Sequence, residues 1–489
     1  MNSSAILTHD GARLPSRQPT QLSASSPARY VLPALTTESR RLARAWLLLA
    51  LAALLGSGLF SVLLVLARTP GVNAWLPAGD FFRVALVVHV DLSVLVWFVS
   101  IAGLLWSINL RPTASTGVQL ASRLPLLLCG LGALGMAVAA FVDPGEAIMA
   151  NYIPVLDSAT FRAALGVFGV GSLCLVLLAM ARAKRIGPAV DGTGALRFGL
   201  HASAVAGGVA LLAFAWSLLE VPAELPATAY YEILFWGGGH ALQFTWTLLM
   251  LVSWLVLVQA CGGRVPLSPR VVLLLFAVAL VSVFVTPLIY LMHDVSSVEH
   301  RHMHTLAMRY GGGLAIAPLM LAVLWALAPL RGLAPQKRPL RGALLTSMLL
   351  FSAGGIIGLG INGSNVRIPA HYHGSIVGVT LALMGVIYWL LPRLGYAAAK
   401  GRMAVLQPWL YGGGQLLHII GLVWSGGYGV QRKVAGAEQV LRSNSEIAGM
   451  GLMGLGGLLA IVGGLMFALV VIAAMRSRPG AAAGRECTS

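Results

Sequence analysis

Metal-binding side chains stand inside or at the ends of long apolar segments of this 489-residue chain. Ionisable residues are costly in such segments and usually mark a functional site. The side chains concerned are His89, His240, His293, Asp294, His371 and His373. Imidazole nitrogen binds heme iron, copper and zinc, and carboxylate oxygen suits harder ions. The residue types therefore predict a buried metal centre that is assembled from several separate segments.

Two of these histidines are only two positions apart, in the sequence Pro369-Ala-His-Tyr-His-Gly. On an α-helix, residues i and i+2 point about 200° apart. His371 and His373 therefore cannot easily bind one metal together, but they can bind two metals on opposite sides of one helix. Because imidazole serves as an axial ligand of heme iron, we interpret the pair as ligands of two hemes that flank this helix.

The remaining side chains would complete the two heme sites. A heme iron with two axial ligands needs a second histidine from a facing helix, and His89 is the best candidate. The other heme would be bound on one side only, with its open face toward His240, His293 and Asp294. A non-heme metal held by these three side chains would give a binuclear site.

The segments that carry these residues are predicted to cross a membrane. The chain is 58% hydrophobic and only 10% charged, which argues against a soluble fold, since a soluble fold needs a more polar surface. Apolar runs of about 20 residues, the length that spans a bilayer, recur from Ala45 to Ala474. We therefore predict an all-α polytopic membrane protein with twelve transmembrane helices. The predicted helices cover residues 44–66, 80–108, 124–142, 161–183, 197–220, 230–259, 269–297, 305–329, 341–361, 369–395, 408–428 and 448–474.

Charge predicts how these helices are oriented. The net charge is +17, and the basic residues gather in short loops and at the two chain ends, as the positive-inside rule expects of cytoplasmic segments. This placement argues against a nucleic-acid partner. We expect a bacterial inner-membrane protein with a flexible cytoplasmic tail at 1–43, a helical core at 44–475 and a short basic tail at 476–489. The metal-binding side chains then fall in the outer half of the membrane.

Residues 40–475 resemble subunit I of the heme–copper oxygen reductase and nitric oxide reductase superfamily. The resemblance rests on His371-Tyr-His, on Leu234-Phe-Trp-Gly-Gly-Gly-His and on Gly385-Val-Ile-Tyr-Trp-Leu-Leu-Pro-Arg-Leu. It implies the family's twelve-helix core and a low-spin heme held by His89 and His373. It also implies a high-spin heme on His371 and a non-heme metal on His240. His418, in a further familiar stretch, is expected to be structural.

The sequence departs from the family pattern at three places. Many oxidases have a tyrosine cross-linked to the metal-binding histidine and a proton-delivering glutamate, where this chain has Phe244 and Leu242. The His-His pair of the seventh helix corresponds to His293-Asp294, and the carboxylate makes iron an option beside copper. Tyr290, one turn before His293, is a candidate replacement for the missing phenol.

These departures favour reduction of nitric oxide, 2 NO + 2 e⁻ + 2 H⁺ → N2O + H2O, which needs fewer electrons than cleavage of O2. Reduction of O2 to water by an atypical terminal oxidase is the alternative. The four cysteines form no CxxC or CxxCH pattern, so the chain encodes no paired-cysteine copper site and no covalent c-type heme. A small electron-donor subunit of the cupredoxin or cytochrome c type is therefore an expected partner.

Two non-enzymatic classes compete with this hypothesis. A diheme electron-transfer cytochrome would explain His89, His371 and His373 but would leave His240 without a role. A polytopic transporter with buried histidines usually shows an internal repeat, and we find none.

Other polar residues lie near the predicted centre. Arg367, just before the tenth predicted helix, is a candidate partner of a heme propionate, because guanidinium matches carboxylate geometry. The stretch 299–304, which contains three histidines, is expected to lie above the hemes or along a proton path. Asp91 and Glu232 are weaker candidates for polar contacts in the pocket.

Overall fold

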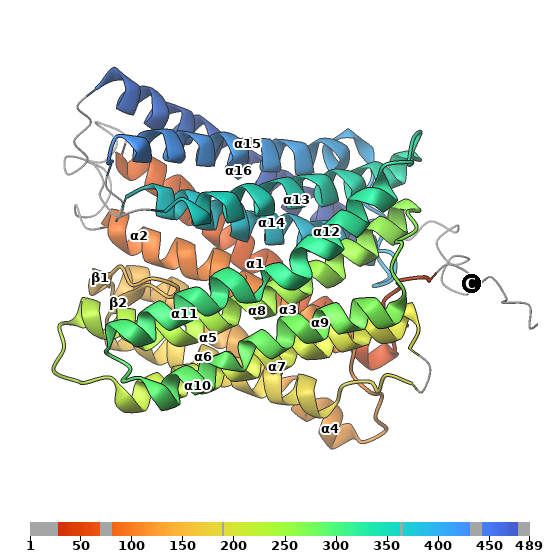
Figure 1. The fold of residues 1–489 in the computed structure, drawn as a ribbon, viewed down its shortest axis with the longest axis horizontal. Helices are drawn as coiled ribbons and strands as arrows, with labels where there is room; N and C mark the ends of the chain where they lie inside the picture. The colour runs from red at the N-terminus through yellow and green to blue at the C-terminus, as the bar shows by residue number, and fades with distance from the viewer. Residues whose placement is uncertain (1–27, 69–80, 188–189, 362–364, 431–442, 478–489) are drawn as a thin grey trace, which may run out of the picture.

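The computed structural model describes residues 28–68, 81–187, 190–361, 365–430 and 443–477. Within these ranges the chain is a bundle of long helices that lie side by side, with one small two-stranded sheet at one end (Figure 1). The elements are α1 (Thr37–Arg68), α2 (Phe81–Val90), the π-helix η2 (Asp91–Val96), α3 (Trp97–Ile108), α4 (Thr116–Ala121), α5 (Leu124–Val142), β1 (Glu146–Ile148), β2 (Val155–Asp157), α6 (Ala159–Ala181), α7 (Gly192–Glu220), α8 (Ala227–Cys261), α9 (Pro269–Val283), α10 (Val285–Met292), α11 (Val298–Gly311), α12 (Gly313–Leu327), the 3-10 helix η3 (Pro335–Lys337), α13 (Arg338–Leu359), α14 (Arg367–Leu390), α15 (Gly401–Gly427) and α16 (Asn444–Arg476).

The all-α polytopic architecture that the sequence predicts is confirmed. Among the described residues, eleven helical segments are long and apolar enough to cross a membrane. The remaining predicted span, the eleventh at 408–428, corresponds to α15, a helix of 27 residues that carries the polar side chains of Gln407, Gln415 and His418. These polar residues lower the hydropathy of α15.

Several helix boundaries differ from the predicted ones, and one difference matters for function. The eighth predicted span begins at residue 305, but α11 begins at Val298. The hydroxyl oxygen of Ser297 accepts a hydrogen bond from the backbone N–H of His300, and this N-cap starts the helix early. Residues 298–304 are therefore helical instead of forming a connecting loop, and His300 and His304 lie one turn apart on the same side of α11.

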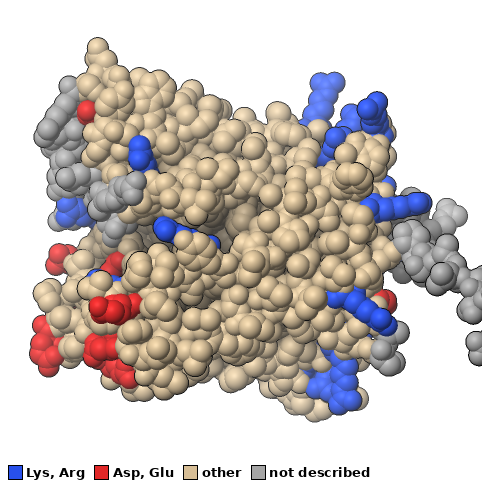
Figure 2. Space-filling view, viewed as in Figure 1, with Lys and Arg blue, Asp and Glu red and all other residues tan. Residues whose placement is uncertain are grey.

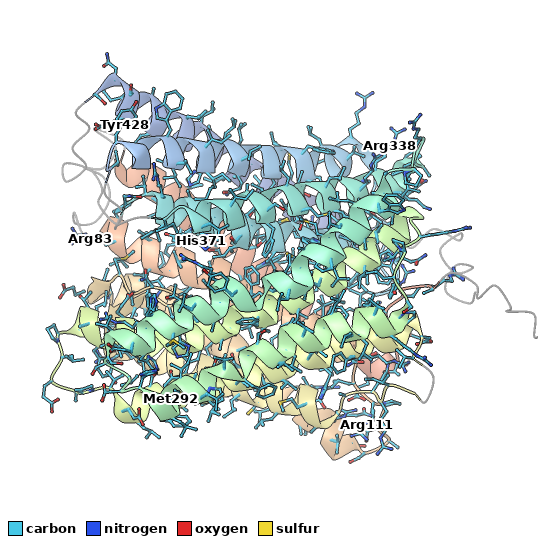
Figure 3. The ribbon with its side chains drawn as sticks, viewed as in Figure 1. Arg83, Arg111, Met292, Arg338, His371 and Tyr428 are labelled. Atoms are coloured by element: carbon cyan, nitrogen blue, oxygen red, sulfur yellow. The ribbon has the colours of Figure 1, made fainter. Side chains whose placement is uncertain are left out.

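The two ends of the bundle carry different side chains. Lys and Arg gather at the end that contains Arg111 and Arg338, which we call the basic end (Figures 2 and 3). His371 and Met292 lie toward the opposite end, which we call the histidine end (Figure 3). That the metal-binding residues share one level of the membrane stays a prediction.

The predicted tails are partly covered by the structure. Residues 1–27 of the predicted 1–43 tail and residues 478–489 of the predicted 476–489 tail lie outside the described residues. The described part of the first tail packs on the bundle, where the hydroxyl of Tyr30 donates a hydrogen bond to the carbonyl oxygen of Leu267 at 2.7 Å. The helix α1 starts at Thr37, seven residues before the first predicted span, with Ser39 and Thr36 hydrogen-bonded at its start.

Glycines let α13 and α14 approach closely at the histidine end. A Cβ atom on Gly374 would lie 2.6 Å from the Cα of Gly354, and one on Gly354 would lie 2.3 Å from the backbone nitrogen of Ser375. Small residues commonly allow such contact between helices in membranes. This packing brings the carbonyl groups of α13 within reach of the side chains at the start of α14.

We predict that Gly374→Ala separates α13 from α14 and destabilises the protein by about 1–3 kcal/mol, the usual cost of overpacking. The measurement is the apparent Tm of the detergent-purified protein, which should fall. Gly355→Ala is the matched control on α13, because no atom lies within 4 Å of a Cβ there, and its Tm should not fall. Equal Tm values for the two variants would contradict the close packing.

Candidate metal and heme centre

His89 of α2 is held by two serines of α1. Its Nδ1 lies 3.0 Å from the carbonyl oxygen of Ser57, 3.0 Å from the Ser57 hydroxyl and 2.9 Å from the hydroxyl of Ser61. A carbonyl oxygen can only accept, so Nδ1 carries the proton and donates it. The other ring nitrogen, Nε2, is then unprotonated and can bind a metal.

The π-helix η2 follows His89 directly and changes the register of the second membrane segment. π-bulges occur frequently at functional sites. Asp91, the first residue of η2, is 1% exposed, and both of its carboxylate oxygens are buried without a hydrogen-bond partner among the described residues. The carboxyl group of Asp91 is therefore an unusual polar group inside the bundle, two residues from His89.

His371 faces α13. Its Nδ1 donates a hydrogen bond to the carbonyl oxygen of Gly354 at 2.7 Å, which again leaves Nε2 available. A Cβ on Gly358, one turn after Gly354, would lie 2.6 Å from the same Nδ1, so a glycine is needed at this position for the ring to fit. The surface seen in Figure 2 is hollowed in the region where Figure 3 labels His371.

His373 faces a different set of neighbours. Its ring centroid lies 4.7 Å from that of His418 on α15. The Nδ1 of His418 donates to the carbonyl oxygen of Met453 on α16 at 2.9 Å. The structure thus places His373 beside His418 and turns His371 toward α13.

His240 of α8 is buried, and its Nδ1 has two partners. The carbonyl oxygen of Trp236 lies at 2.8 Å and the hydroxyl of Tyr152 at 2.9 Å. The carbonyl again requires the proton on Nδ1 and leaves Nε2 free. Tyr152 lies in the loop between β1 and β2, and no pattern in the sequence marked it as a site residue.

Two buried histidines of α11 lie beside His240. His300 is 0% exposed and His304 is 1% exposed, and their ring centroids are 4.6 Å apart. The ring of His304 is 6.1 Å from that of His240. Both ring nitrogens of His300 and the Nε2 of His304 are buried without a hydrogen-bond partner among the described residues. We call His240, His300 and His304 the histidine pocket.

The structure does not bring Asp294 to the histidine pocket. Asp294 is exposed, and its carboxylate accepts hydrogen bonds from the backbone N–H and the hydroxyl of Ser296. These two donors lower the pKa of Asp294. His293 is half-buried at the end of α10.

Tyr290 of α10 packs against the histidine pocket. Its ring lies 4.6 Å from that of His300 and 5.5 Å from that of His304, both edge to face. Its hydroxyl donates to the carbonyl oxygen of Ala213 at 3.0 Å and lies 2.7 Å from the hydroxyl of Ser217. The phenol is therefore tied to α7 and presents its ring, not its oxygen, to the two histidines.

Three consecutive glycines of α8 make room for the pocket. A Cβ on Gly237 would lie 2.3 Å from the hydroxyl oxygen of Tyr290 and 2.9 Å from the Nε2 of His304. A Cβ on Gly238 would lie 2.3 Å from the ring of Phe214, and one on Gly239 would lie 2.2 Å from the ring of Tyr152. Each of the three glycines before His240 thus leaves room for a different neighbouring side chain.

Arg367, the first residue of α14, packs over the end of α15. Its Cγ lies 2.7 Å from the position of a Cβ on Gly426, and its Nε is buried without a partner within the described part of the chain. A buried guanidinium nitrogen of this kind suits an anionic group.

The chemistry of these side chains fits a bound metal and heme, but their positions are not those of a closed metal site. Among the described residues, no three His, Cys, Asp or Glu side chains are already arranged to hold a metal ion. The histidine pocket would therefore need its rings to turn toward a common point. The unpartnered nitrogens of His300 and His304 favour such a change, because a buried polar group without a partner is costly.

Comparison with known proteins gives four related findings. Residues 41–475 match the model of the family described as cytochrome c and quinol oxidase polypeptide I. An uncharacterised protein of Rickettsia prowazekii is 28% identical over 89% of this chain and 96% of its own length. Another of Aquifex aeolicus is 25% identical over 74% of this chain and 88% of its own length. Cytochrome c oxidase subunit 1 of Thermus thermophilus is 27% identical over 45% of this chain and 43% of its own length.

We predict that His300→Leu stabilises the metal-free protein. Leucine fills a similar volume and removes two buried nitrogens that lack partners, which relieves about 1–3 kcal/mol of desolvation cost. The measurement is the apparent Tm after treatment with a chelator, which should rise. His302→Leu on the exposed side of α11 is the control and should not raise it. A lower Tm for His300→Leu would mean that the ring has a polar partner in the metal-free protein.

Proposed function

Because the chain belongs to the family of cytochrome c and quinol oxidase polypeptide I, we propose that it is the catalytic membrane subunit of a heme-dependent respiratory reductase. The observation that carries this proposal is that His89, His240 and His371, from three different helices, each have Nδ1 hydrogen-bonded to a backbone carbonyl and Nε2 left free. An imidazole in this state is a ready metal ligand.

We propose that His89 and His373 hold a low-spin heme and that His371 holds a high-spin heme. The different neighbours that His371 and His373 face support ligation of two separate hemes, and the hollow at His371 supports the second site. Arg367 would contact a propionate through its unpartnered Nε. The hemes would supply electron transfer and the iron that binds the gas.

For the non-heme metal we propose the histidine pocket as the ligand set. The buried nitrogens of His300 and His304 without partners support this choice, and the carboxylate of Asp294 already has two donors from Ser296. A ligand set of imidazoles suits copper, iron or zinc. The ligation by His293 and Asp294 that the sequence suggests stays a prediction.

We propose nitric oxide as the preferred substrate. Its coupling consumes two electrons, which two metal centres can deliver, whereas O2 cleavage draws on a further redox group. The residue at the family's cross-linked position is Phe244, which cannot serve as one. Residues 241–260 of α8, between His240 and the basic end, contain no ionisable side chain, so the two protons would come from the histidine end.

Reduction of O2 to water is the second candidate. The observation in its favour is the presence of two other phenols near the histidine pocket, Tyr152 at His240 and Tyr290 at His300. Either phenol could replace the tyrosine that is absent at Phe244.

We also propose an orientation in the membrane and an electron-donor subunit. The basic end would face the cytoplasm of a bacterium, and the histidine end would face the outer side of the inner membrane, as the positive-inside rule implies. Electrons would arrive from a small subunit of the cupredoxin or cytochrome c type, since the four cysteines encode no c-type heme and no paired-cysteine copper site in this chain.

We predict that His373→Ala and His89→Ala each abolish the low-spin heme signal in the optical and electron paramagnetic resonance spectra, because each removes one of two axial ligands. His371→Ala should remove the high-spin signal instead. His201→Ala is the control, since this histidine lies on α7 and contacts none of the proposed ligands in the described structure, and it should leave both signals intact. A low-spin spectrum that survives His373→Ala would contradict the assignment.

We predict that the purified protein, supplied with an artificial electron donor, consumes NO at least ten times faster than O2. Metal analysis of the same sample should find non-heme iron or copper, and His240→Ala, His300→Ala and His304→Ala should lose it. The variants His293→Ala and Asp294→Ala test the ligation suggested by the sequence. Rapid O2 reduction with slow NO turnover would reverse the choice of substrate.

A further inference from the structure

A short hairpin at the histidine end reaches the proposed metal site. The strands β1 and β2 pair antiparallel, with Glu146 opposite Asp157 and Ile148 opposite Val155, and they join α5 to α6. The hairpin tip lies against α8, because Tyr152 of the tip touches His240 and Trp236. This loop belongs neither to the long helices nor to the histidine motifs.

Tyr152 has an unusual backbone. Its φ is +68°, and among the described residues no other non-glycine residue has a positive φ. This left-handed conformation is unfavourable for tyrosine, and such strain persists only where surrounding contacts fix it. Strained residues of this kind cluster at functional sites.

Two contacts with α8 hold the hairpin tip in place. One is made by Asn151 and the other by the ring of Tyr152. The backbone N–H of Asn151 donates to a carboxylate oxygen of Glu232 at 2.8 Å, and the side-chain amide of Asn151 donates to the other oxygen. Glu232 lies on α8 two turns before His240. The ring of Tyr152 fills the space that the missing Cβ of Gly239 leaves open. The tip is thus clamped to the same helix that carries His240.

The hydrogen bond at His240 has a defined direction. The carbonyl oxygen of Trp236 forces the proton onto Nδ1, so the phenol oxygen of Tyr152 accepts from the same N–H and does not donate to it. Two acceptors then hold the His240 ring from one side.

We propose that Tyr152 is a positioning residue of the metal centre, whose phenol oxygen holds the His240 ring so that Nε2 faces the two histidines of α11. The inference rests on the proposed function, since it takes His240 as a metal ligand. Hydrogen-bond acceptors behind a ligating histidine fix its orientation and raise its basicity, and their loss typically weakens metal binding by about 10–100-fold. Glu232 would act through Tyr152 by clamping the hairpin.

The test is Tyr152→Phe in the full-length, heme-loaded protein. Phenylalanine keeps the ring in the space beside Gly239 and removes only the oxygen. After the non-heme metal is stripped, Zn²⁺ affinity is measured by competition with a chromophoric chelator, a readout that needs no turnover. We expect a loss of affinity of about 10–100-fold with no change in heme spectrum. Tyr231→Phe, which removes a neighbouring phenol stacked on Phe235, is the matched control and should bind Zn²⁺ like the parent protein.

A double-mutant cycle tests whether Glu232 acts on the metal site through Tyr152. Glu232→Ala should weaken Zn²⁺ binding without touching the His240 ring itself, and Glu232→Ala combined with Tyr152→Phe should lose no more than Tyr152→Phe alone. Additive losses would show that Glu232 does not act through Tyr152 and would overturn that part of the inference.

Different results would contradict the role of Tyr152 and the proposed metal centre. If His240→Ala and His304→Ala leave Zn²⁺ affinity unchanged, the proposed metal centre is wrong. If His240→Ala weakens Zn²⁺ binding but Tyr152→Phe binds like the parent protein, the metal centre stands and the positioning role of Tyr152 is overturned.

Discussion

The structure depends on one repeated interaction, an imidazole Nδ1–H donated to a backbone carbonyl inside an apolar bundle. His89, His240 and His371 each make it, with the carbonyls of Ser57, Trp236 and Gly354. A carbonyl can only accept, so the contact fixes the ring tautomer without a second charged group, which would be costly at this depth. Nε2 is left as a neutral donor for a metal. Buried carboxylates are therefore not needed to orient these rings.

The interaction requires an accessible carbonyl, and close packing of helices supplies it. Gly354 provides the carbonyl for His371 and also forms the contact with Gly374 that draws α13 and α14 together. Gly358 leaves the space that the ring occupies. At His240, the carbonyl belongs to the same helix, and glycines at 237–239 admit the surrounding aromatic rings instead. Glycine content in these helices thus follows from the histidines that they must accommodate.

The sequence was sufficient to predict the all-α membrane architecture. Spans near 20 residues and the divergence of His371 from His373 are consequences of helix geometry alone. His300 and His304 were visible as part of a histidine-rich stretch, but a helix start at Val298 was needed to place them on one face, and it depends on a cap at Ser297. Tyr152 carried no signal, because a tertiary contact across 88 positions of the chain brings it to His240.

The contact between Tyr152 and His240 changes the interpretation of Phe244, which stands where many oxidases have a tyrosine. In the sequence, Phe244 removes the phenol from α8, one turn after His240, and this loss favours a reaction with few electrons. In space, a phenol still touches His240, but it enters from a hairpin outside the helices and binds Nδ1 as an acceptor. An oxygen that accepts from the ring steadies a ligand, whereas a covalent link would join the two π-systems. The phenol of Tyr152 thus suits the orientation of His240 better than electron donation.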